Sequence, residues 1–180
     1  MSEARERLLD TATRLFYAEG IHTVGIDRII AEAAIAKATF YRHFKTKDDL
    51  VVAYLEREYA RQKEMLESVP GEGADSVAAI FERLGRLSGE PGFRGCPFLN
   101  AAVEFANPEH PVRAVVENYR GWFRELMAER LRAAGHEDPE GAARVLLLTR
   151  DGVTISGGVG DAETVRVGIR TALAQVGIRA

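Results

Sequence analysis

Apolar side chains recur at helical spacing along almost the whole chain, and this periodicity decides the fold class. In the first segment Leu8, Ala12, Leu15 and Phe16 fall on one face of a helix. No run of alternating β-branched and polar residues reaches the length of a strand. We therefore predict an all-α protein of about nine helices. The apolar periodicity recurs within residues 26–33, 50–66, 77–87, 112–131 and 165–176.

Capping residues and breaks mark where these helices begin and end. Gly20 follows the first helix as a C-cap, and Pro97 stands at the tolerated first position of a later helix. Thr46 and Asp49 have the spacing of a capping box. Residues 70–73 (PGEG) form the most conspicuous break, and on local composition they are the best candidate for a domain boundary.

Composition places the chain among ordinary globular proteins. Its 180 residues are 46% hydrophobic and 28% charged, with no apolar stretch near the length of a membrane span. The charged N-terminus does not resemble a secretory signal. The single cysteine excludes an internal disulfide and fits a reducing compartment. We therefore expect a cytoplasmic protein with no membrane partner.

One short segment concentrates positive charge. Residues 35–47 contain four basic residues and no acidic one, which leaves a net charge of −7 on the rest of a chain whose total is −3. A basic patch on an acidic body can bind a phosphate backbone. A solvated helix face would have the same composition, so charge alone leaves both interpretations open.

Together with the residues before it, this basic segment has the organisation of a helix-turn-helix motif. Two short helices, near 26–33 and 37–44, are separated by a tight turn, and a helix of this kind fits the major groove. Phe40 and Phe44 are four residues apart and should face the core. The residues then turned outward in various directions are Lys37, Ala38, Thr39, Tyr41, Arg42 and His43.

These side chains suit DNA. Lys37 and Arg42 can bond guanine edges or phosphates, and Thr39 offers a hydroxyl and a methyl group to thymine. Tyr41 can hydrogen-bond a phosphate. Lys47, in the first turn of the next helix, stands beside backbone N–H groups that also attract phosphate. We predict that these residues, with double-stranded DNA as partner, form a binding site.

The run from Gly20 to Phe44, followed by Lys47-Asp48-Asp49-Leu50, resembles the TetR/AcrR repressors. Their pattern is a glycine, a short link, a helix ending Ala-Gly-Val, then Ser-Lys-Gly-Thr-Leu-Tyr-x-His-Phe and Ser-Lys-x-x-Leu. The resemblance covers about residues 5–55. Residues 94–100, Ala-Ala-x-Glu and 110–113 resemble one recurring C-terminal type of these regulators.

The resemblance implies two domains and a homodimer. Residues 1–48 would form a three-helix helix-turn-helix DNA-binding domain, and residues 49–180 a helical effector-binding and dimerisation domain. The last two helices, expected at 139–157 and 161–177, would build a four-helix bundle with a second copy. A buried monomer core would have a similar apolar content.

Three departures from the family pattern fall in the DNA-binding region. Ala34 replaces the usual turn glycine, and a left-handed alanine costs roughly 1 kcal/mol. Ala36 replaces the serine that normally caps the recognition helix, and Val24-Gly25 replaces a Thr-Ser-like pair that often caps the second helix and contacts phosphate. Thr23 or Arg28 could supply a compensating phosphate contact.

Apolar and polar residues of the later helices suggest an effector pocket for an unidentified small molecule. Aromatic residues at helical spacing also build plain cores, and Asn100 and the pair Arg150-Asp151 could be satisfied by internal hydrogen bonds. Cys96, at a helix N-terminus, is either a redox or electrophile sensor or a small buried cap residue. The candidate pocket residues are Phe81, Leu84, Cys96, Phe98, Asn100, Phe105, Tyr119, Trp122 and Phe123.

Nothing in the sequence indicates catalysis. The four histidines lack metal spacing, and residues 157–160 lack the lysine of a phosphate loop and predict a hinge or turn. We predict no enzyme activity, metal or cofactor. The expected function is a ligand-responsive repressor that binds a palindromic operator as a homodimer and is released by a small-molecule effector. Alternatives are a small-molecule-binding protein with the same fold and a non-specific architectural DNA binder; activation also stays open.

Overall fold

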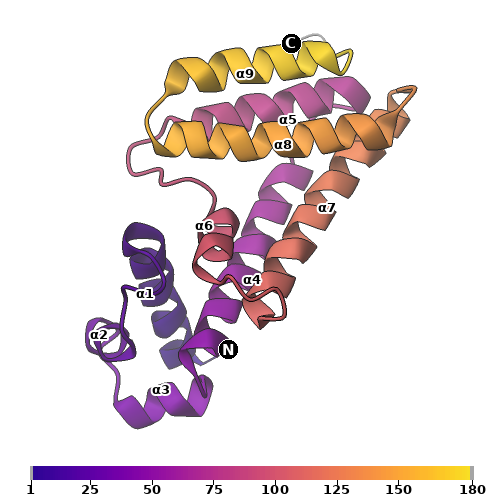
Figure 1. Cartoon of the computed structure of the whole chain (residues 1–180). Coiled ribbons are helices and arrows are strands. Elements are labelled where there is room, and N and C mark those ends of the chain that lie inside the picture. The colour runs from indigo at the N-terminus through magenta and orange to yellow at the C-terminus, as the bar shows by residue number, and fades with distance from the viewer. Residues whose placement is uncertain (1, 179–180) are drawn as a thin grey trace. The chain divides into compact units, whose positions relative to one another are not determined.

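The computed structural model describes residues 2–178, and within them the chain forms nine α-helices and no strand (Figure 1). The predicted all-α class is thereby confirmed. No helix of this part of the chain is long and apolar enough to cross a bilayer. The helices are α1 (Glu3–Glu19), α2 (Ile26–Glu32), α3 (Lys37–His43), α4 (Lys47–Glu67), α5 (Gly73–Ser88), α6 (Pro97–Glu104), α7 (Pro111–Ala133), α8 (Pro139–Gly158) and α9 (Ala162–Gln175).

The chain divides into two compact units. Unit 1 comprises Met1–Ala60 and Pro97–Glu117, and unit 2 comprises Arg61–Cys96 and Asn118–Ala180. The functional division expected between residues 48 and 49 concerns which residues contact DNA, and it stays a prediction.

The break at residues 70–73 is not a domain boundary, because it lies inside unit 2. Val69 is 5% exposed, and a Cβ on Gly73 would lie 3.1 Å from the Cβ of Ala134. Gly73 has a φ of +51°. Glycine therefore serves a tight turn and a close packing contact at this position, and composition alone cannot distinguish such a turn from a linker.

The core of unit 1 packs both α3 and α4 against α1. Phe40 of α3 and Leu15 of α1 are fully buried, and the ring of Phe16 lies 5.7 Å from that of Tyr54. The predicted capping box is present at the start of α4. The Thr46 N–H donates to Asp49 Oδ2 (2.9 Å), and the Asp49 N–H donates to Thr46 Oγ1 (3.1 Å). These bonds set where the long helix begins after the basic segment.

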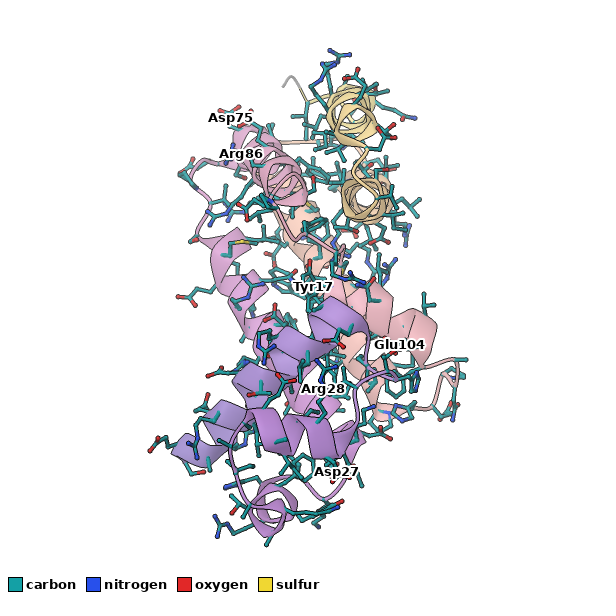
Figure 2. All side chains as sticks on the ribbon, turned by 90° about the vertical axis from the view of Figure 1, so that its left-hand side faces the viewer. Tyr17, Asp27, Arg28, Asp75, Arg86 and Glu104 are labelled. Atoms are coloured by element: carbon teal, nitrogen blue, oxygen red, sulfur yellow. The ribbon has the colours of Figure 1, made fainter. Side chains whose placement is uncertain are left out.

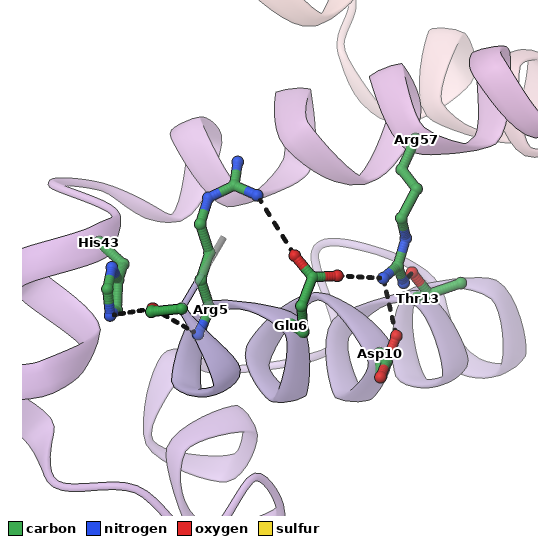
Figure 3. A network of polar contacts seen from close by, with 7 residues as sticks. Arg5, Glu6, Asp10, Thr13, His43 and Arg57 are labelled. Carbon is green, nitrogen blue, oxygen red and sulfur yellow. Dashed lines mark hydrogen bonds and ion pairs between the residues drawn. The ribbon is translucent and has the colours of Figure 1, made fainter.

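Polar contacts also hold α1 in place (Figure 3). Arg57 of α4 donates to Asp10 Oδ1 (2.7 Å) and to the hydroxyl of Thr13 on α1. Ser2 accepts from the Arg5 N–H and shares a hydrogen bond of 3.2 Å with His43 of α3. The last turn of α3 is therefore tied to the first turn of α1.

Unit 2 is built around α5, α8 and α9, which lie side by side (Figure 1). Gly157 and Gly158 form the end of α8, so the turn predicted at residues 157–160 is present but begins two residues later, at Val159. A Cβ on Gly157 would lie 2.5 Å from the Cβ of Ser88, which shows that α5 and α8 approach closely at this point. The buried core includes Phe81, Phe123, Leu126, Met127, Leu131, Leu146, Val153, Val165 and Leu173.

Candidate nucleic-acid interface

The turn between α2 and α3 has the geometry that a helix-turn-helix needs. Ala34 has a φ of +52°, the left-handed conformation predicted at this position. Its N–H donates to the Ala31 carbonyl at 3.1 Å, and the Ile35 N–H donates to the Ile30 carbonyl at 3.3 Å. The backbone therefore closes α2 and turns into α3 even though a methyl group replaces the usual hydrogen.

The two phenylalanines of the α3 segment orient the helix. Phe40 is 0% exposed and Phe44 is 4% exposed, with 6.1 Å between their ring centroids. Tyr41, by contrast, is 46% exposed. Of the other predicted contact residues, Lys37, Ala38 and Arg42 are exposed, and Thr39 and His43 are half-buried. The helix presents a polar and mainly basic face of the composition expected for groove binding.

Neither short helix carries a side-chain N-cap. Gly25 precedes α2 and Ala36 precedes α3, and neither accepts a hydrogen bond through a side chain. Both absences agree with the departures from the family pattern. The first turns therefore depend on packing for their stability.

Arg28 of α2, an expected phosphate contact, is engaged by two carboxylates. It donates to Glu19 Oε1 (2.8 Å) and, through Nε, to Glu32 Oε1 (2.8 Å). The hydrogen bonds that Arg28 donates to Glu19 and then to Glu32 raise the pKa of Arg28, and accepting the bond from Arg28 is the main cause of the lowered pKa of Glu19. A phosphate must therefore compete with both carboxylates for this guanidinium.

Lys37, the first residue of α3, forms an ion pair with Asp27 of α2. The distance from Lys37 Nζ to Asp27 Oδ1 is 2.9 Å, and the side chains are 62% and 83% exposed. The hydrogen bond to Asp27 is the main cause of the raised pKa of Lys37. Sequence reasoning missed Asp27, because the partners are ten positions apart and no helical spacing links them.

Lys47 and Thr23 complete the predicted set. The Lys47 side chain is half-buried with Nζ 5.9 Å from the centroid of Phe16, and burial lowers the pKa of this lysine against the opposing charges of Glu104 and Asp48. Thr23 is exposed in the turn before α2.

Glu104, the last residue of α6, binds the turn that follows α1. Its two carboxylate oxygens accept from the backbone N–H groups of Ile21 (2.8 Å) and His22 (2.6 Å), and His22 Nδ1 lies 3.3 Å away. Because more than eighty residues separate the partners, no local pattern in the sequence could have indicated this contact.

Further contacts within unit 1 fix the C-terminal end of α6. The ring of Phe105 lies 5.0 Å from that of His22 and 4.5 Å from that of His110. Arg113 of α7 donates to the carbonyls of Ala102 (3.3 Å) and Phe105 (3.4 Å). A cation at a helix C-terminus is favourable, so α6 is held at this end by charge as well as by packing.

The predicted effector residues are distributed over both units. Phe98, Asn100 and Phe105 belong to unit 1, and the other six belong to unit 2. In unit 2 Phe81 and Phe123 meet edge to face at 6.5 Å in the core. The Tyr119 hydroxyl donates to Gln62 (2.6 Å) and the Trp122 indole donates to Glu67 (3.1 Å). Their place in one ligand pocket stays a prediction.

Arg150 is the most deeply buried cation described, at 1% exposure. It donates to Asp151 Oδ1 and to the sulfur of Cys96, each at 2.8 Å, and its guanidinium carbon lies 4.7 Å from the Tyr119 centroid. Burial works against the charge of Arg150, yet facing Cys96, Tyr119 and Asp151 raises its pKa overall. Arg150 and Asp151 thus have hydrogen-bond partners within the protein, which is one of the two interpretations that the sequence allows.

Two further observations bear on ligands of unit 2. Cys96 is 4% exposed, which favours the interpretation of a buried cap residue. A groove of about 650 Å³ lies among the ends of α5 and α8 and the start of α9, and its lining includes Arg86, Phe93 and Arg166 but none of the predicted pocket residues. Within residues 2–178 no cluster of histidine, cysteine or acidic residues could hold a metal ion.

Residues 8–54 match the family model described as bacterial regulatory proteins, tetR family. The repressor NemR of Escherichia coli is 28% identical over 120 residues, which cover 64% of this chain and 60% of NemR, so the match spans about three fifths of that relative. The regulator LmrA of Bacillus subtilis is 31% identical over 140 residues, covering 74% of this chain and 73% of LmrA.

Solved structures agree over nearly the whole length. The crystal structure of a TetR-family transcriptional regulator from Streptomyces coelicolor is 44% identical and superposes with a TM-score of 0.87, covering 98% of this chain and 97% of that one. Together with the exposed basic helix after a left-handed turn, these similarities show that the chain belongs to the TetR family of transcriptional regulators.

Proposed function

We propose that this protein is a ligand-responsive transcriptional repressor that binds a palindromic operator as a homodimer and is released by a small-molecule effector. The observation that carries the proposal is the orientation of α3: Phe40 is fully buried while Lys37 and Tyr41 are exposed. A helix anchored in this way can enter a major groove without unfolding any part of unit 1.

The contact residues divide by role. Tyr41 and Lys47 are assigned to phosphates, which position the protein but carry no sequence information. Arg28 would reach a phosphate only by giving up its hydrogen bonds to Glu19 and Glu32. Lys37 and Thr39 are assigned to base edges, with Ala38 close enough to the helix start to contact a thymine methyl. Arg42, His43 and Thr23 would flank the groove.

A second copy of the chain would cover an apolar stripe on α8. Leu148 and Ile155 of α8 are 69% and 61% exposed and stand seven residues apart on one face, and Val159, the residue that caps α8, is 78% exposed. Exposed apolar side chains in such a row are typical of an interface. With the neighbouring α9, this face fits the four-helix bundle that the family resemblance implies.

The effector would bind among the helices that follow α4. A ligand shifts an equilibrium only by its differential affinity for two states, so the pocket must differ between the DNA-bound and released forms. A melting-temperature screen of a compound library identifies candidates, because a ligand specific for the native state raises the melting temperature. A compound that stabilises the protein but leaves DNA binding intact is not the effector.

Selection from a pool of randomised duplexes tests the DNA-binding part directly. We expect enrichment of an inverted repeat whose half-site centres lie about 34–36 Å apart, one helical turn, or a multiple of it. Tyr41→Phe and Lys47→Ala should weaken binding to selected and unselected duplexes alike, whereas Lys37→Ala and Thr39→Ala should change the selected sequence. Equal affinity for selected and random DNA would support an architectural binder, and binding to neither at low salt would support a small-molecule-binding protein.

Cys96 allows a separate test of how release occurs. If Cys96 is only a buried cap residue, Cys96→Ser should leave release of DNA by peroxide or alkylating agents unchanged. Loss of that release in the variant would instead identify a thiol sensor.

A further inference from the structure

The ion pair between Asp27 and Lys37 lies on the surface proposed to meet DNA. Asp27 is in the first turn of α2 and is 83% exposed, and Lys37 is the first residue of α3 (Figure 2 labels Asp27 and Arg28 on α2). The structure therefore places a carboxylate next to a lysine assigned to base reading. A negative charge at this place weakens binding to a polyanion such as DNA. Its presence in the interface therefore calls for a functional explanation.

Lys37 differs from two other cations of residues 35–47 in having an acidic partner. Arg42 and Lys45 are exposed, and among the described residues 2–178 neither forms an ion pair. These two can attract phosphates of any sequence. Lys37 differs from them because its ammonium group is already bonded to Asp27 at 2.9 Å.

The chemistry of the two kinds of DNA contact explains what the carboxylate does. An ammonium group carries three N–H donors, and with one donated to Asp27 two remain. The edge of a guanine, with its O6 and N7 acceptors, is neutral overall and can accept those donors. A phosphate carries a full negative charge and is repelled by the adjacent carboxylate. Asp27 therefore disfavours a phosphate contact of Lys37 more than a base contact.

From this arrangement we infer that Asp27 is a specificity-determining residue that keeps Lys37 from binding phosphates and thereby lowers the affinity for non-operator DNA. The inference rests on the proposed function, since it assigns Asp27 a part in the same interface. It predicts that removal of the negative charge of Asp27 strengthens binding to random DNA and reduces the ratio of operator affinity to random-DNA affinity.

Asp27→Asn tests this inference, because asparagine keeps the size of the side chain and an acceptor oxygen but not the charge. The probes are the duplex enriched by the wild-type protein and the unselected random pool. One extra phosphate contact makes the slope of log affinity against log salt concentration steeper by about 0.9. We therefore expect the ratio of variant to wild-type affinity for the pool to be about eightfold larger at ~0.1 M salt than at ~1 M salt. Affinity for the enriched duplex should rise less, so the ratio of the two falls.

Asp75→Asn is the matched control. Asp75, which Figure 2 also labels, is an exposed acid in the first turn of a helix, α5, and belongs to unit 2, whereas the predicted DNA-contact residues belong to unit 1. Its replacement changes the net charge equally, and we expect affinity for the pool to stay within twofold of the wild type. An equal gain in both variants would overturn the inference, since net charge would then explain the effect.

The same substitution in a Lys37→Ala background tests whether Asp27 acts through Lys37. We expect Asp27→Asn to have most of its effect on pool affinity only when Lys37 is present. A full gain without Lys37, or no gain with it, contradicts the inference. If the wild-type protein enriches no sequence at all, the proposed function fails, and that outcome is distinct from these.

Discussion

Ala34 holds a left-handed conformation that costs a non-glycine residue free energy. Its φ is +52°, and the turn between α2 and α3 is built around it. We expect Ala34→Gly to raise the free energy of unfolding by about 1 kcal/mol, because glycine adopts this conformation without steric strain. Urea denaturation followed by circular dichroism measures the change.

Ala36 is the control for that substitution. Its φ is −74°, which any residue adopts. Ala36→Gly should therefore bring no gain, since glycine adds only freedom to the unfolded chain. Equal stabilisation at both positions would show that strain at Ala34 is not the cause.

At this scale the sequence predicts what is local. The left-handed turn at Ala34 and the orientation of Phe40 follow from neighbours within a few positions, and both are as expected. Asp27 and Glu104 were not foreseen, because each acts on a partner that only folding brings near. The charge partners of a DNA-binding face are therefore harder to predict than the face itself.

The helix α3 lacks a capping side chain, and a single substitution at its N-cap position can supply one. Ala36 has extended backbone angles suited to an N-cap. Ala36→Ser should add a hydrogen bond to the first turn of α3 and raise the free energy of unfolding by about 1 kcal/mol. Thr46→Ala, which removes the cap of α4, should lower it by a similar amount. The two variants are compared by urea denaturation, and a loss of stability on adding the serine would contradict the assignment.

The contact between α1 and α2 depends on carboxylates that stay ionised. The pKa of Glu19 lies below its ordinary value of 4.5, mainly because of its hydrogen bond to Arg28, and the pKa of Glu32 is lowered by Arg14 and then Arg28. A lowered pKa in the folded state gives stability that is present above the ordinary value and is lost as pH falls below it. We expect the free energy of unfolding to decrease as pH falls through 4.5 and below.

Replacing Arg28 with methionine should make this acid-induced decrease shallower, since Glu19 would lose its partner and Glu32 would keep only Arg14. Urea titrations between about pH 7 and pH 3 compare the two proteins. An unchanged pH dependence would mean that other carboxylates dominate acid unfolding.

Helix boundaries were predicted well because caps and periodicity are local signals. The errors fall where distant elements meet. Gly157 of α8 packs against Ser88 of α5, and residues 70–73 form a turn inside unit 2. A glycine that permits close packing and a glycine that permits flexibility look alike in a sequence.

For the whole molecule, the proposed dimer is the central expectation. Leu148→Asp places a charge in the exposed stripe of α8 and should convert a dimer into monomers at micromolar concentration. Sedimentation equilibrium measures the mass. Val103→Asp, at a residue of α6 that is 84% exposed, is the matched control and should leave the dimer intact. A monomeric wild-type protein would contradict the proposed binding to a palindrome.

The family and the fold could be predicted from residues 5–55, where many spaced positions agree. The effector site could not, because aromatic residues of a pocket and of a core share the same spacing and differ only in what packs on them. Phe81 and Phe123, for example, pack against each other in the core of unit 2. Specific ligand chemistry is therefore the part least accessible from the amino-acid sequence.

The carboxylate of Glu104 has a practical consequence for spectroscopy. Because it accepts from the amides of Ile21 and His22, these two protons should resonate downfield and exchange slowly with deuterium while the end of α6 stays bound. A nitrogen-15 spectrum would thus contain a natural pair of probes that monitor α6 without any attached label. Loss of their protection upon addition of a compound would reveal, before any DNA is present, that the compound loosens this contact.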